Sequence, residues 1–135
     1  QGSPISTLSD VDRPGIRIGV VEKASPDVYL TGTIRSATLV RAPTIAGMVE
    51  SLRAGRADVL FGTKAGMLDQ AKKLAGSRVL EGRSGGENTG MAVPKRRELS
   101  AAYVRQFVES AKSEGLVKAA IERAALRGVV VAPLK

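Results

Sequence analysis

The sequence contains no cysteine and no histidine. Without cysteine the chain has no disulfide framework and no thiol nucleophile. Without histidine it lacks the commonest metal ligand and the usual general base. No apolar run reaches the length of a membrane span, and no N-terminal signal peptide is visible. These absences argue against thiol, histidine and metal chemistry and against membrane insertion, and the sequence predicts no cofactor.

Aromatic residues are also scarce, with no tryptophan, two phenylalanines and two tyrosines. Few side chains are therefore suited to stacking on single-stranded nucleic acid. Lys and Arg total 21 against 13 Asp and Glu, which gives a net charge of +8. Such an excess attracts anionic partners, but the cations are dispersed and form one dense cluster, at residues 95–97. We expect a solvated basic surface and no nucleic-acid partner.

The composition that remains is globular, with 43% hydrophobic and 25% charged residues in a chain of 135. Residues 1–3 have the character of a tag remnant. Short β-branched runs predict strands at 16–21, 37–41, 57–61, 79–80 and 90–94. Helical periodicity predicts helices at 25–33, 44–54, 63–74, 98–114 and 116–126. The alternation predicts an α/β fold with a five-stranded, mostly parallel sheet flanked by helices, in which the strand at 90–94 is antiparallel.

Candidate binding residues follow from this order, because an open parallel sheet binds ligands beyond the carboxyl ends of its strands. The candidates are Lys23, Ala24 and Ser25 after the first strand, Thr44 after the second, and Gly62 and Thr63 after the third. Backbone amides at a helix N-terminus favour an anion such as a carboxylate. The alternative interpretation of Ser25, Thr44 and Thr63 is that each caps its own helix. Lys64 is either a lysine of the crevice or a surface lysine.

Catalytic patterns are poorly represented. No phosphate-binding glycine loop opens a helix after the first strand. Glu22 is the one carboxylate at a post-strand corner, and Asp10 and Asp12 precede the first strand, so they belong to the opposite end of the sheet. Paired carboxylates at a crevice are therefore missing, and hydrolytic chemistry is not supported.

Several stretches together resemble a known family. Residues 8–20 read LSDVDRPGIRIGV, residues 55–60 read GRADVL after a helix, and residues 90–95 read GMAVPK. Their order and spacing, with the later helices, resemble the second lobe of type II periplasmic solute-binding proteins, the kind that binds polar amino acids for ABC importers. The resemblance covers residues 8–127.

The resemblance implies that residues 4–127 form one lobe with C-terminal helices, that residues 128–135 form an extended tail, and that the first lobe lies outside this sequence. It implies a non-enzymatic protein of the bacterial periplasm. Such a protein binds a small solute, an amino acid or an organic acid, between its lobes and delivers it to an ABC permease.

The ligand-binding positions of that family are only partly kept. A Gly-Thr or Gly-Ser pair usually grips the ligand's carboxylate after the first strand, and here the place reads Lys23-Ala24-Ser25. An aspartate usually binds the ligand's ammonium after the third strand, and here that position falls on Thr63. The resemblance thus implies a carboxylate-bearing solute for which an amine is not required.

Other interpretations stay open. One is a sensor or receptor module of the same fold. Another is an enzyme similar to cyclohexadienyl dehydratase, which would need Glu22 as its general acid. We also expect a homodimer, because the sequence has an apolar stripe on its last helix and an apolar run at residues 129–131. Without a covering lobe, both would be exposed.

Overall fold

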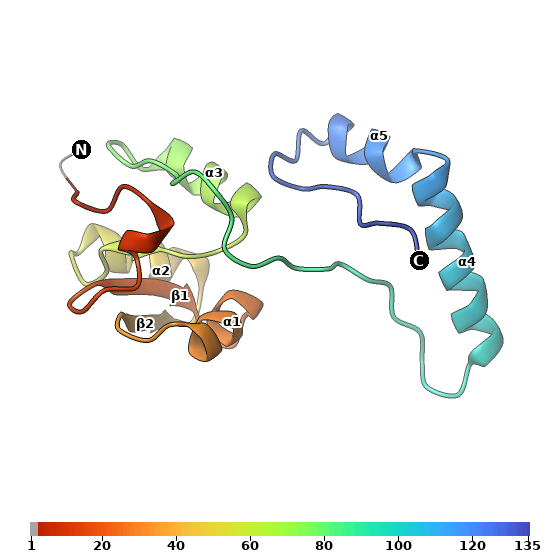
Figure 1. Cartoon of the computed structure of the whole chain (residues 1–135), viewed down its shortest axis with the longest axis horizontal. Coiled ribbons are helices and arrows are strands. Elements are labelled where there is room, and N and C mark those ends of the chain that lie inside the picture. Colours follow the sequence, from red (N-terminus) through yellow and green to blue (C-terminus); the bar gives the residue numbers. More distant parts are fainter. Residues whose placement is uncertain (1–2) are drawn as a thin grey trace. The chain divides into compact units, whose positions relative to one another are not determined.

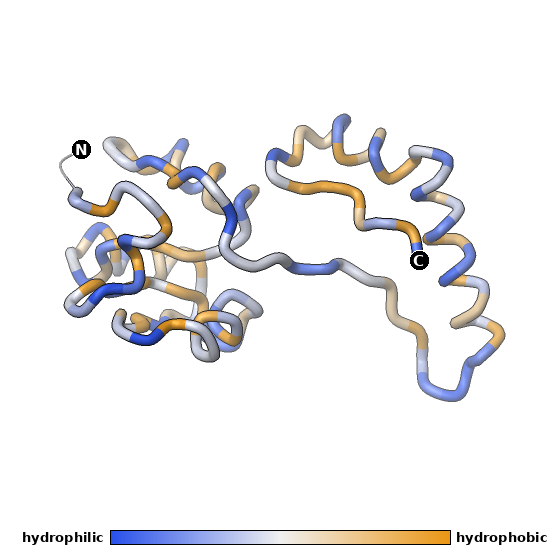
Figure 2. The backbone as a smooth tube through the Cα atoms, viewed as in Figure 1, coloured by the Kyte–Doolittle hydropathy of each residue, from blue (hydrophilic) through white to orange (hydrophobic). Residues whose placement is uncertain are grey.

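The computed structural model describes residues 3–135 and divides into two compact units between Gly86 and Glu87. We call the first the sheet unit and the second the helical unit. Figure 2 shows that the chain near this division is mostly pale or blue, as expected for a polar connection. The predicted tag remnant falls largely on residues 1–2, which lie outside the described residues.

The sheet unit contains three parallel strands, β1 (Arg17–Val21), β2 (Thr38–Ala42) and β3 (Val59–Leu60), in the order β2-β1-β3. Figure 1 labels the paired strands β1 and β2. Arg17 pairs with Thr38 in the first ladder, and Ile18 pairs with Val59 in the second. These strands lie where the β-branched runs predict them, although β3 is shorter than expected. The central strand is the most buried, as the near-continuous apolar run suggests.

A helix follows each strand: α1 (Ser25–Thr33), α2 (Ile45–Arg53) and α3 (Lys64–Lys73), and a 3-10 turn, η1 (Leu8–Asp10), precedes β1. The step from β1 to β2 and the step from β2 to β3 run in opposite directions across the sheet. Right-handed crossovers in opposite directions place α1 and α2 on opposite faces. The chain is therefore wound on both sides of its sheet.

The side chains of β1 support this arrangement. Ile18 and Val20 are fully buried and pack with Leu30 of α1 on one face. Gly19 points to the other face, where a Cβ would lie 2.6 Å from Leu60 Cδ2 and 3.3 Å from Ser51 Oγ of α2. Glycine at this position therefore allows α2 to approach the central strand closely.

The predicted five-stranded sheet is wrong, because the described residues contain three strands. Residues 79–80 remain irregular between Gly76 and Gly82, whose φ angles are +76° and +95°. Among the described residues, no strand pairs with residues 79–80, so their apolar character alone does not make them a strand. Residues 90–94 are also irregular, and Pro94 there lacks the N–H that a ladder requires.

The helical unit consists of α4 (Glu98–Ser113) and α5 (Leu116–Arg123), joined at Gly115, which has a φ of +78°. The predicted inner face of α4 is confirmed, since Ala101, Val104, Val108 and Ala111 are its shielded apolar residues. α5 ends three residues earlier than expected. The extended tail returns to α4, where Lys112 Nζ donates to the Pro133 carbonyl at 2.8 Å.

Among the described residues, no helix is both long and apolar enough to cross a membrane.

Candidate functional site

The three parallel strands bring the post-strand corners to one edge of the sheet, which we call the carboxyl edge. Lys23, Ala24 and Ser25 follow β1, Thr44 follows β2, and Gly62 and Thr63 follow β3. The strand order reverses at β1, which has β2 on one side and β3 on the other. We call the place between the ends of β1 and β3 the switch point, because doubly wound sheets hold ligands where the strand order reverses.

The corner after β1 already satisfies part of its own backbone. Lys23 has a φ of +61°, a left-handed conformation that glycine adopts more easily. Its N–H donates to Asp27 Oδ2 at 2.9 Å, and the Ala24 N–H donates to the Val21 carbonyl at 3.2 Å. Two amides expected to hold a ligand carboxylate therefore have acceptors within the chain.

The predicted capping role of Ser25 is wrong, because the N-cap of α1 is Ala24 and Ser25 is the first helical residue. Asp27 explains the shift. Its carboxylate reaches back from the third helical position to the amide that precedes the N-cap. An acidic residue at the third helical position is a known signal of a helix N-terminus. Here Asp27 is that residue, and it places the N-cap at Ala24 rather than at Ser25.

Asp27 is the buried charge of this region, with 6% of its surface exposed. Besides the Lys23 amide, it accepts hydrogen bonds from Arg41 Nε at 2.9 Å and Thr31 Oγ1 at 3.3 Å. Arg41 Nη2 also donates to Thr31 Oγ1 at 2.8 Å, which closes a network between α1 and β2. The Lys23 amide, and next the Arg41 guanidinium, hold the pKa of Asp27 below its usual value. No motif or spacing in the sequence indicates this network.

Thr44 and Thr63 are helix caps, so this alternative is confirmed for both. Thr44 Oγ1 accepts from the Gly47 N–H at 3.1 Å, and Thr63 Oγ1 accepts from the Gly66 N–H at 3.2 Å. A hydroxyl that accepts one bond keeps its own hydrogen for a second partner. Gly62 lies against α3, where a Cβ would approach Met67 Cε to 2.9 Å.

Removing either cap should weaken the sheet unit measurably. We expect Thr63→Ala and Thr44→Ala each to lower the free energy of unfolding by about 1 kcal/mol, because a helix-terminal N–H loses its acceptor. Urea unfolding followed by circular dichroism measures this loss. Thr63→Ser is the matched control, since it keeps the hydroxyl. Equal losses for the serine and alanine variants would contradict the capping role.

Two lysines lie at the switch point. The exposed Lys23 ammonium is 3.5 Å from Glu22 Oε1, and the half-buried Lys64 ammonium is 3.7 Å from Glu81 Oε2. Both ion pairs are loose and involve exposed carboxylates, so each contributes little to stability. The corners after β1 and β3 therefore each present an ammonium group that an anionic ligand could take over from its glutamate.

An aromatic pair adjoins the same edge. Tyr29 of α1 stacks on Phe61, which directly follows β3, with ring centroids 6.0 Å apart and an interplanar angle of 9°. Gly85 packs against the tyrosine ring, where a Cβ would lie 2.9 Å from Cζ. Phe61 also packs against the core of Ile18 and Val20. The pair thereby links α1 to the corner after β3.

The described residues contain no group of three or more acidic, histidine or cysteine side chains placed to hold a metal ion. No protein-family model, no curated protein and no solved structure matches the chain.

Proposed function

We propose that the chain is the second lobe of a type II periplasmic solute-binding protein and holds one side of a small carboxylate-bearing solute, which an ABC permease then receives. The observation that carries this proposal is the parallel order β2-β1-β3. It gathers the corners after all three strands at one edge and creates a switch point between β1 and β3. The first lobe would supply the other side of the site by closing on the solute.

The charges at the switch point support an anionic ligand. Lys23 and Lys64 lie on its two sides, and the Lys23 amide already donates to Asp27. The carboxylate of the solute would therefore bind the lysine ammonium groups rather than that amide. Thr63 stands at the position where the resembled family has its ammonium-binding aspartate, and its oxygen already accepts from Gly66. An organic acid without an amine fits these groups.

The chain alone should bind such a solute weakly. In the proposed assembly the first lobe would supply further contacts and close on the solute, and both would raise the affinity above that of this chain. A dissociation constant on the order of 1 mM corresponds to about −4 kcal/mol, a plausible contribution from two charged contacts. Weak binding of this kind is best followed by nuclear magnetic resonance.

The decisive experiment compares succinate with aspartate, which is the same dicarboxylate carrying an amine. We expect succinate to shift the amide signals of the corners after β1 and β3, with aspartate binding within about tenfold of it. Lys23→Met and Lys64→Met should each remove most of the succinate response. Lys72→Met is the matched control, because Lys72 lies in the last turn of α3 and pairs with Asp69.

A hundredfold preference for aspartate, worth about 2.7 kcal/mol, would contradict the proposed ligand class. Shifts confined to other parts of the sheet unit would contradict the proposed site. Conversion of the added acid during the titration would indicate an enzyme instead, and Glu22→Gln would then identify its general acid.

A further inference from the structure

α4 carries a second apolar stripe, beside the face that packs within the helical unit. It consists of Leu99, Tyr103 and Phe107, spaced four residues apart, so that their side chains form one row along the helix. Their exposed fractions are 89%, 70% and 50%. A contiguous exposed apolar surface with two aromatic rings is typical of an interaction site. We call this row the α4 stripe.

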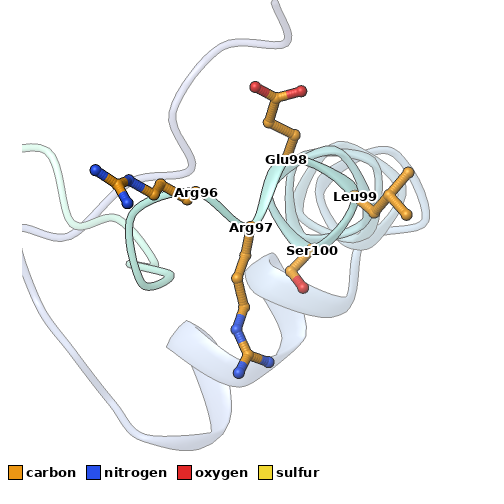
Figure 3. Close-up of a pocket in the computed structure, with 5 residues that line it drawn as sticks. All are labelled: Arg96, Arg97, Glu98, Leu99 and Ser100. Atoms are coloured by element: carbon orange, nitrogen blue, oxygen red, sulfur yellow. The ribbon is translucent and has the colours of Figure 1, made fainter.

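The α4 stripe is not flat. Tyr103, Gln106, Phe107 and Ser110 line an open hollow halfway along it. A second hollow lies at the beginning of the helix and is lined by Arg96, Arg97, Glu98, Leu99 and Ser100 (Figure 3). In Figure 3 the leucine projects from the helix, while both arginines extend from the chain just before it. Each hollow is open enough to receive a side chain from a partner.

The charges at the two ends of the α4 stripe have opposite signs. Residues 95–97 are basic and precede the first turn, and Glu114 is the C-cap residue that follows the last turn. On a helical projection Glu114 lies on the same side as Tyr103 and Phe107. Within residues 3–135, no ion pair involves Arg96, Arg97 or Glu114. With Glu98 in the first turn, residues 95–98 carry a net charge of +2, so the stripe is positive at its beginning and negative at its end.

We propose that two copies of the chain associate through the α4 stripe, with their α4 helices antiparallel about a two-fold axis. A surface that is positive at one end and negative at the other is complementary to itself only in this orientation. Parallel helices would place the basic residues of both copies together. Rows of residues four apart pack into the grooves of a facing helix in the commonest class of helix contact.

The register follows from the positions along the stripe. With the axis between Gln106 and Phe107, Tyr103 faces Ser110 of the other copy and fills its hollow. Leu99 then faces Glu114 of the other copy, and Arg97, two residues before Leu99, lies near the same glutamate. This interface differs from the one expected from the sequence. In the structure, the last helix turns Val117 and Ile121 partly inward, and the run at residues 129–131 forms no strand.

The association should be weak, because one pair of helices of this length buries less than the 1,200 Å² or so that stable interfaces need. We expect a dissociation constant of roughly 10–100 μM. Sedimentation equilibrium of the full chain from micromolar to millimolar concentration would show a monomer converting to a dimer. Phe107→Lys should weaken the dimer at least about tenfold. Val130→Lys is the matched control, because Val130 is 67% exposed but lies on the tail.

Charge exchange tests the orientation. Arg97→Glu and Glu114→Arg should each weaken the dimer several-fold, and the double variant should regain most of the loss, since every Arg97 lies near a Glu114 of the other copy. The absence of cysteine permits a second test. Gln106→Cys lies close to the axis and should form a disulfide-linked dimer under mild oxidation. Arg105→Cys, one residue away on another side of the helix, should not.

Any of three results would overturn the proposal. The first is a monomer at millimolar concentration, as expected if the α4 stripe is covered within the chain. The second is a dimer that survives Phe107→Lys while circular dichroism shows a folded protein. The third is a monomer whose sedimentation with vesicles of anionic lipid is lost in Phe107→Lys, which would assign the stripe to a membrane surface.

Discussion

Replacing Ile18 by alanine is expected to lower the free energy of unfolding of the sheet unit by about 3 kcal/mol. Ile18 is fully buried in the central strand and packs with Val20 and Leu30. The loss combines the transfer of buried methyl and methylene groups with a cavity that the rigid strand cannot close. A small domain has only about 5–15 kcal/mol of stability in total, so this single change should shift the unfolding midpoint strongly.

Urea unfolding measured on the amide signals of β1 would report this loss for the sheet unit alone. Val28→Ala is a suitable control, since Val28 is 67% exposed on α1 and its replacement should change stability by less than about 0.5 kcal/mol. Ile18→Val should cost about 1 kcal/mol. An alanine variant as stable as the parent would show that Ile18 is not in the core.

Asp27→Ala is expected to cost about 2 kcal/mol. Removing one partner of a buried ion pair usually costs about 3–5 kcal/mol, and the cost here is reduced because the Arg41 side chain is 42% exposed and can be hydrated. The Lys23 N–H and Thr31 Oγ1 also lose their acceptor. Asp69→Ala is the matched control, because its pair with Lys72 is exposed and worth little.

The same variant should change the pH dependence of stability. The pKa of Asp27 is lowered in the folded chain, mainly by the Lys23 amide and then by Arg41. Its contribution is therefore complete above the ordinary aspartate pKa of about 4 and is lost as the pH falls through the folded value. Unfolding at a series of acidic pH values should show the variant and the parent converging. A constant difference across this range would contradict the charge network.

The stability of Asp27→Ala should still decrease in acid, because the folded chain also lowers the pKa of other carboxylates. Amides of Ser6 and Thr7 lower the pKa of Asp10 to about 2. The pKa of Asp12 is lowered by three backbone amides of residues 35–37, with that of Ala37 having the largest effect. These contributions also disappear as the pH falls through the folded pKa values. The free energy of unfolding of Asp27→Ala should therefore still fall with decreasing pH, although less steeply than that of the parent.

Much of the sheet unit could be predicted from local patterns. The β-branched runs indicated β1, β2 and β3, and Thr44 and Thr63 stood where caps are expected before two periodic segments. These signals depend on residues that are close in the sequence, and the structure confirms them. The sequence also predicted that the post-strand corners lie at one edge of the sheet. Strands connected by helices are parallel, and parallel strands end at the same edge.

The sites that could not be predicted depend on contacts between separate elements. Asp27 and Arg41 meet only because α1 packs on β1 beside β2, and neither residue has a spacing that indicates the pair. Ser25 before a proline looks like a cap, but the Asp27 carboxylate moves the start of the helix by one residue. The runs at residues 79–80 and 90–94 have the composition of strands, but neither pairs with a strand of the described sheet. Composition alone does not show whether a run has a partner strand.

The unequal ladders of the sheet have a consequence for the order of folding. β1 pairs with β2 over five residue positions but with β3 over only two. The second pairing also closes a loop roughly twice as long as the first, which adds about 0.6 kcal/mol of chain entropy. The β1-α1-β2 unit should therefore assemble first, and β3 should dock last and detach first. Local opening would begin beside the switch point, so the sheet is most easily deformed at the place where we propose that a solute binds.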